Sequence, residues 1–226
     1  MATALILGEM MKIQWTQTIF AVSLIGIASS AFATISYSDE AAFTAGVGGA
    51  PIAMESFESI TGGNGTSLAF PTVDVSCDGG AWCSSFFGVS PILPTDGSQG
   101  VFFATPDSIT FTFATPITAF AIDVGDLGTQ GPTDFSATLS NGNEITFLSG
   151  YSGSSFDQLF IGLIDNIEFT SITFHGSMPD DGIYFDRMQT ALAIPVPEPE
   201  IYVMLLAGLG FLGIVSRRRK QMVSIG

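Results

Sequence analysis

The sequence predicts an all-β protein, an antiparallel β-sandwich between two apolar terminal segments. Three observations predict it: short stretches alternate apolar and polar residues, Gly or Pro lies in nearly every gap between them, and 20 of 226 residues are Phe. Alternation with a period of two is typical of a strand that buries one face. Many such strands pack as two layers, and large apolar side chains fill the space between them.

Two segments show the alternation most clearly. Residues 109–113 read Ile-Thr-Phe-Thr-Phe, and residues 135–139 read Phe-Ser-Ala-Thr-Leu. The step Asn141-Gly142-Asn143 predicts a tight turn that pairs 135–140 with 144–148, since Asn and Gly accept the positive φ of hairpin turns. Further strands are expected at 52–57, 101–104, 117–124, 156–163, 167–174 and 183–192.

Two local features interrupt the strand pattern. Between Phe169 and Ile172 the apolar phase slips by one residue, which a β-bulge explains. The only helical candidate in the domain lies near 39–45, where Ser38 or Asp39 can cap the first turn.

The N-terminus has the pattern of a secretory signal peptide, residues 1–33. Lys12 precedes an apolar core at 19–28, and Ala31-Phe32-Ala33 forms a small-residue cleavage site. The pattern begins at Met11, which is therefore an alternative start of translation. An uncleaved membrane anchor is the other interpretation, and the short core and the cleavage site disfavour it.

The C-terminus combines a linker, an apolar segment and a basic end. Pro197-Glu198-Pro199 lies in a linker, 194–200, that its prolines keep extended. Residues 201–216 carry no charge and are expected to form a short transmembrane helix. The tail 217–226 belongs on the cytoplasmic side because it begins with the basic cluster Arg217, Arg218, Arg219 and Lys220.

This C-terminal arrangement resembles the PEP-CTERM sorting signal. The resemblance rests on the order of Pro197-Glu198-Pro199, the apolar helix around 207–213 and the basic cluster. It implies recognition by an exosortase, cleavage near the motif, and delivery to the cell surface or extracellular matrix of a Gram-negative bacterium, as in a biofilm. Residues 221–226 depart from the pattern, since such tails usually stop soon after the basic cluster.

The domain 34–193 also resembles the jelly-roll domains that often precede such tails. Residues 120–126 fit the central strand and residues 182–186 fit the final strand. The resemblance implies a module that binds carbohydrate or calcium, or a plain matrix module. Exopolysaccharide is the partner that it suggests.

The domain is strongly acidic. Residues 34–199 contain 19 Asp and Glu and a single basic residue, Arg187, a net charge of −18. Phosphate backbones repel such a charge, so nucleic-acid binding is excluded. Solubility explains the acidity, and affinity for divalent cations is the sharper alternative. Glu55, Glu58 and Asp186 are the predicted Ca²⁺ ligands because the first and last strands of a jelly roll often neighbour each other; solvated surface carboxylates are the alternative.

Two cysteines and two aromatic residues complete the candidates. Cys77 and Cys83 are the only cysteines, and after export they are expected to form a disulfide that fixes one loop. Zinc is not expected, because the spacing patterns of zinc sites are absent. Trp82 and Tyr151 lie in Gly-rich segments and are the predicted platforms for sugar rings, although a Trp beside a disulfide also serves as packing.

The residue inventory argues against catalysis. His175 is the only histidine, and the sequence contains no Gly-x-Ser-x-Gly elbow for a nucleophilic serine. We therefore predict a noncatalytic exported surface or matrix protein that binds carbohydrate or calcium or has a structural role. The alternative is an exported glycan-active enzyme that uses a pair of carboxylates.

Overall fold

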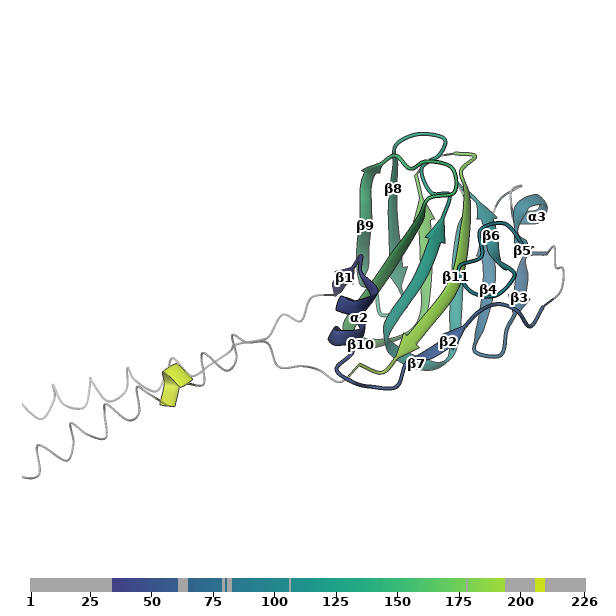
Figure 1. Cartoon of the computed structure of the whole chain (residues 1–226). Coiled ribbons are helices and arrows are strands. Elements are labelled where there is room, and N and C mark those ends of the chain that lie inside the picture. Colours follow the sequence, from purple (N-terminus) through teal and green to yellow (C-terminus); the bar gives the residue numbers. More distant parts are fainter. Residues whose placement is uncertain are drawn as a thin grey trace, which may run out of the picture. The chain divides into compact units, whose positions relative to one another are not determined.

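The computed structural model describes residues 34–60, 65–78, 80, 83–105, 107–177, 179–193 and 206–209. The described part of residues 34–193 forms an all-β sandwich with two short helices, so the prediction of an all-β sandwich is confirmed (Figure 1). The predicted signal peptide, the motif Pro197-Glu198-Pro199 and the tail 217–226 lie outside the described residues. Of the predicted membrane helix, only 206–209 are described, and they are helical. No helix in the described part of the chain is long and apolar enough to span a membrane.

Eleven strands and two helices make up the described part of residues 34–193. The helices are α2 (Glu40–Gly46) and α3 (Cys83–Phe86). The strands are β1 (Ile35–Tyr37), β2 (Ala53–Glu55), β3 (Ser67–Ala69), β4 (Val73–Asp78), β5 (Gly88–Ser90), β6 (Gly100–Ala104), β7 (Ser108–Gly125), β8 (Thr133–Leu139), β9 (Glu144–Tyr151), β10 (Gln158–Gly176) and β11 (Gly182–Ala191).

The strands form one continuous antiparallel sheet that folds over into two layers. The first layer has the order β1-β10-β7-β11-β6-β5, with β2 also paired to β11. The second layer has the order β3-β4-β7-β10-β8-β9. Strands β7 and β10 belong to both layers because they pair along two separate stretches, one in each layer. They carry the chain from one layer to the other.

The continuity of β7 and β10 corrects the strand prediction. The sequence predicts two strands in each region, 109–113 with 117–124 and 156–163 with 167–174. The structure joins each pair into one long bent strand. The exposed step at Pro116, which lacks an N–H, marks the bend in β7, and register shifts after Ile164 mark it in β10.

The other local predictions fare better. The hairpin between β8 and β9 forms, with Gly142 at φ 91° and the Leu139 N–H donating to the Asn143 carbonyl at 2.8 Å. The bulge also appears, as a register shift between Phe169 and Ser171. The predicted helix is α2, and the Asp39 carboxylate caps it by accepting from the Ala42 N–H at 2.8 Å.

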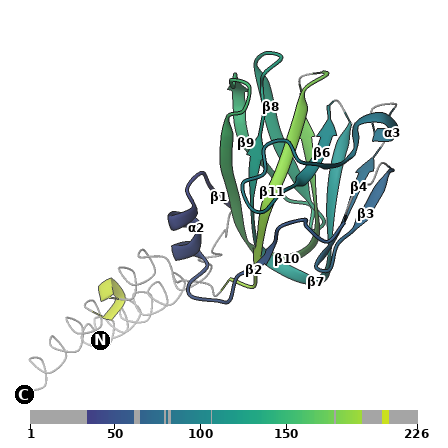
Figure 2. The ribbon, with the colours of Figure 1, turned by 45° about the vertical axis from the view of Figure 1, so that its right-hand side comes forward.

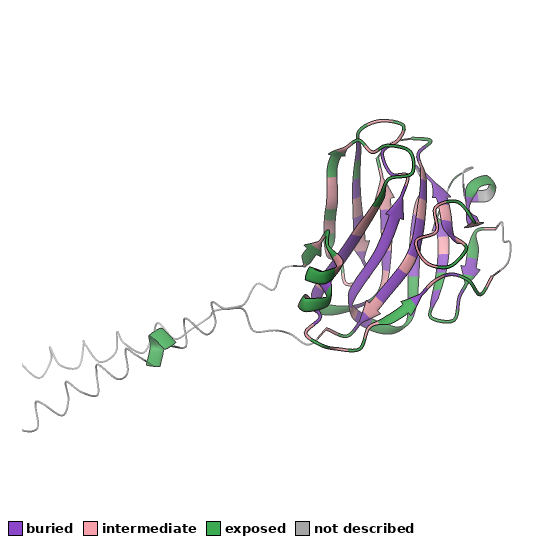
Figure 3. Cartoon of the chain, viewed as in Figure 1, coloured by how far each residue is buried: buried purple, intermediate pink, exposed green. Residues whose placement is uncertain are grey.

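Phenylalanine rings fill the space between the two layers. Phe174 is fully buried, and its ring centroid lies within 6.0 Å of five other rings. Buried residues run along the strands of both layers (Figure 3). The five neighbours of Phe174 are Phe111, Phe120, Phe135, Phe147 and Phe185.

A second, smaller core lies on the outer face of the first layer. Phe43 of α2 is fully buried there against three alanines of β7 and β11, Ala119, Ala121 and Ala191. These small side chains leave room for the helix to lie close to the sheet. Helix α2 therefore covers one end of this face, beside β1 and β10 (Figure 2).

Candidate functional site

The other end of the same face, away from α2, carries a row of residues across four neighbouring strands. At one register level lie Phe102 of β6, Tyr184 of β11, Gly125 of β7 and Gln158 of β10. We call these four residues the aromatic row. The rings of Phe102 and Tyr184 are 4.7 Å apart between centroids and both are half-buried, while Gln158 is exposed. Strands are about 4.8 Å apart, so the row extends about 14 Å across the sheet.

Tyr184 is the polar member of the ring pair. Burial raises the pKa of its hydroxyl, and the negative charge of Asp126 raises it further. The hydroxyl also forms a hydrogen bond with the side chain of Ser90. Tyr184 therefore stays neutral at physiological pH and presents both a ring face and a hydrogen-bonding group.

The loop 91–99 covers part of the aromatic row, at the buried Gly125. Leu93 adopts φ 58° and packs over Gly125, where an added Cβ would lie 3.3 Å from Leu93 Cδ1. A side chain at position 125 would push this loop away from the sheet. Glycine thus permits the close approach of Leu93 to the row.

Two carboxylates fasten the loop 91–99. Asp186 Oδ2 accepts from the backbone N–H groups of Thr95 at 2.6 Å and Asp96 at 2.8 Å. Glu58 Oε1 accepts from the N–H groups of Ser98 at 2.6 Å and Gln99 at 2.9 Å. The bonds from Ser98 and Gln99 lower the pKa of Glu58, so this tether contributes stability above about pH 4.3 and loses it as pH falls.

The remaining polar cluster on this face holds α2 in place. Arg187 lies in a bulge of β11 with φ 50°, between the register pairs of Asp186 and Gln189. Its guanidinium donates to Asp123 through Nε at 2.8 Å and Nη2 at 3.1 Å, and to Glu40 through Nη1 at 2.7 Å. Asp123 and Glu40 raise the pKa of Arg187. The one arginine of the domain therefore joins α2 to β7 and β11.

The structure does not bring the three predicted calcium ligands together. Strands β2 and β11 are neighbours, as expected, but Glu55 pairs with Met188, which faces the main core. Asp186 instead pairs with Asp123 on the outer face. In the described ranges the oxygens of Glu55, Glu58 and Asp186 are not all within 4.8 Å of one another. Calcium at these three residues stays a prediction without support from this geometry.

The predicted disulfide forms between Cys77 and Cys83, whose Cα atoms are 5.5 Å apart. The Cys83 N–H also donates to the Asp107 carboxylate at 2.8 Å. These three residues lie close enough to hold a metal ion, but the sulfurs are bonded to each other and have no thiolate to offer. The cluster is therefore structural.

Of the two residues predicted as platforms for sugar rings, only Tyr151 is among the described residues. Trp82 lies outside the described residues. Tyr151 is half-buried and packs against Gly128 and Gly153 at the start of two loops. Burial and the charge of Asp157 raise the pKa of Tyr151. The rings of the aromatic row, which are also half-buried, were not predicted, because nothing in the sequence places Phe102 beside Tyr184.

His175 lies among hydroxyl groups on the outer face of the second layer. Its Nδ1 is 2.9 Å from Ser108 Oγ, and its Nε2 is 3.3 Å from Thr138 Oγ1. No carboxylate among the described hydrogen-bond partners of His175 orients the ring, as a nucleophile-activating histidine requires. The arrangement is that of a polar strand residue bonded to its cross-strand neighbours.

The comparisons with known proteins place a signal at the C-terminus. The family described as the PEP-CTERM protein-sorting motif matches residues 195–220. The chain therefore carries a PEP-CTERM motif, which indicates an exported protein that is processed at the cell envelope. A search of curated proteins finds no match.

Several solved structures are similar to this chain at low scores. The xylan-binding module CBM15 gives a TM-score of 0.41 at 14% identity, covering 66% of this chain and 100% of that chain. A family 29 carbohydrate-binding module complexed with mannohexaose gives 0.40 at 9% identity, with 64% and 93% covered. The CBM22-1 xylan-binding domain from Paenibacillus barcinonensis Xyn10C gives 0.36 at 14% identity, with 65% and 97% covered. None of these similarities assigns a ligand to this chain.

Proposed function

We propose that this protein is a noncatalytic surface or matrix protein that binds carbohydrate through the aromatic row. The observation that carries the proposal is the pair Phe102 and Tyr184. Their half-buried rings are 4.7 Å apart between centroids, and the two residues are paired across β6 and β11. Ring faces of this kind pack on the C–H faces of sugars, and the hydroxyl of Tyr184 and the amide of Gln158 supply hydrogen bonds beside them.

The fold supports a binding role for this end of the sandwich. Strands β6, β7, β10 and β11 hold the row on a continuous hydrogen-bonded framework, so its side chains keep their spacing without a ligand. A preformed site loses little conformational entropy when a ligand binds. The exosortase is the partner that the C-terminal motif implies, and exopolysaccharide is the partner that we propose for the domain.

Replacement of Tyr184 by Ala is expected to weaken glycan binding about tenfold, because it removes a stacking face and a hydroxyl. Phe102→Ala is expected to act in the same direction. Isothermal titration of the purified protein against hexasaccharides of xylose, mannose and glucose measures the change. Ile167→Ala is the control, since this side chain is 52% exposed and lies at the bend of β10. The proposal fails if no glycan binds, or if both aromatic variants bind as the parent protein does.

The sorting motif leads to a separate expectation. In a host with an exosortase, the mature surface protein is expected to lack peptides from residues 205–217, because cleavage occurs near Pro197-Glu198-Pro199. Mass spectrometry of the surface fraction tests this. Recovery of those peptides from the mature protein would show instead that the C-terminal segment is retained as an anchor.

A further inference from the structure

The negative charge of the domain favours some classes of glycan over others at the aromatic row. Residues 34–199 hold 19 acidic side chains and only Arg187 to oppose them. In the described part of the chain, the recorded ion pairs of Arg187 are with Asp123 and Glu40. Among the described residues, Asp126, Asp157 and Asp180 have no recorded ion pair. The net charge of −18 favours positively charged ligands.

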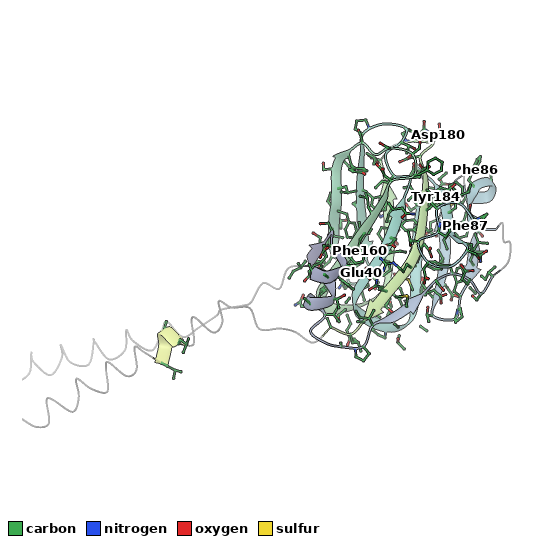
Figure 4. The ribbon with its side chains drawn as sticks, in the orientation of Figure 1. Glu40, Phe86, Phe87, Phe160, Asp180 and Tyr184 are labelled. Carbon is green, nitrogen blue, oxygen red and sulfur yellow. A yellow bond between two sulfur atoms is a disulfide. The ribbon has the colours of Figure 1, made fainter. Side chains whose placement is uncertain are left out.

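Some of the acidic residues lie beside the aromatic row, where β7 ends. Asp126 directly follows Gly125, and its charge is near enough to Tyr184 to raise the pKa of the hydroxyl. The Asp126 N–H donates to the Asp157 carbonyl at 3.0 Å, so these two acidic residues are neighbours. Asp180 is exposed, and Figure 4 shows it above Tyr184 at the same end of the sandwich.

An exposed ring accompanies these carboxylates. Phe156 is 68% exposed and adopts φ 72°, an uncommon conformation for an aromatic residue. Its N–H donates to Asp126 Oδ1 at 3.1 Å, so the backbone at Phe156 is held beside the Asp126 carboxylate. The surface beside the row thus combines aromatic rings with negative charge. Ammonium groups bind to both, through ion pairs and through cation–π contacts.

We propose that the ligand of the aromatic row is a polysaccharide of amino sugars whose amino groups are free and protonated. This inference rests on the proposed function, since it names the substrate class of the same site. The rings of Tyr184 and Phe102 pack on the sugar rings, and Asp126 and its acidic neighbours pair with the ammonium groups. Anionic glycans are repelled by the net charge of −18, and neutral glycans gain the stacking alone.

The test compares two ligands that differ in charge and share one backbone. Hexamers of glucosamine and of N-acetylglucosamine are titrated into the purified full chain at pH 6, at low and high salt. The glucosamine hexamer is expected to bind about tenfold more tightly, since several exposed ion pairs each contribute up to about 1 kcal/mol. This advantage is expected to shrink at high salt because the charges are exposed.

Two variants test whether the preference for glucosamine comes from the carboxylates beside the aromatic row. Asp126→Asn is expected to reduce the ratio of the glucosamine affinity to the affinity for the acetylated hexamer. Glu168→Gln removes the same charge from an exposed position at the bend of β10 and is expected to leave both affinities unchanged. An equal loss in both variants would overturn the proposal, because the attraction would then come from the net charge and not from the row.

The two proposals can fail separately. If the acetylated hexamer binds as tightly as glucosamine and Tyr184→Ala abolishes both, the carbohydrate site stands and the inferred substrate class is wrong. If neither hexamer binds and the neutral hexasaccharides do not bind either, both proposals are overturned.

Discussion

Replacement of Phe174 by Ala is expected to lower the free energy of unfolding by about 3–5 kcal/mol. The side chain is fully buried, and its ring contacts lie in both layers of the sandwich, with Phe135 in one layer and Phe185 in the other. Truncation removes the transfer free energy of the ring and leaves a cavity that the paired strands cannot close. In thermal unfolding, a domain of this size should lose about 10 °C in Tm.

Two further variants test whether the loss of stability comes from the buried ring of Phe174. Phe174→Leu fills part of the space and is expected to cost less than the Ala variant. Ile167→Ala truncates an exposed side chain on the same strand and should change the free energy of unfolding by less than about 0.5 kcal/mol. A similar small loss for Phe174→Ala would mean that the two layers do not pack on each other through this ring.

The strand pattern of the sequence predicts most of the sandwich, since apolar alternation is a local property. It identifies the hairpin at Asn141-Gly142-Asn143, the cap at Asp39 and the bulge after Phe169. It does not distinguish one bent strand from two separate ones, because the exposed residues around Pro116 look like a loop. Strand β4 was not predicted although Val73, Val75 and Cys77 alternate, so that signal was available.

The candidate site depends on contacts between distant parts of the chain. The aromatic row joins Phe102 to Tyr184, which are separated by the length of β7 to β10, and no local pattern reveals that register. The acidic composition left solubility and cation binding as alternatives, and it did not indicate which carboxylates are used by the protein itself. Glu58 and Asp186 accept hydrogen bonds from the backbone of the loop 91–99. No local sequence pattern predicts these contacts, because the donors are far away along the chain.

The second large effect is expected at Arg187. Composition shows that the domain has one arginine, and the structure shows that it holds Asp123 and Glu40. The Arg187 side chain is 24% exposed and that of Asp123 only 10%, so their ion pair is largely withdrawn from water. Removing one partner from such a pair leaves an uncompensated carboxylate against α2 and the sheet.

Arg187→Met is therefore expected to lower the free energy of unfolding by about 3 kcal/mol in urea denaturation at pH 7. Met keeps the length of the side chain and the same backbone conformation in the bulge, so the loss reports the charge and its hydrogen bonds. Glu40→Gln, which removes only the more exposed of the two ion pairs, should cost less than about 1 kcal/mol.

The double variant separates the two possible causes of that loss. Arg187→Met combined with Asp123→Leu removes both buried charges, and it should recover much of the stability, because no unpaired carboxylate remains. If the double variant is as unstable as Arg187→Met alone, the loss comes from packing of the arginine side chain and not from the stranded charge. If Arg187→Met unfolds at the parent's urea concentration, the ion pair does not hold α2 against the sheet.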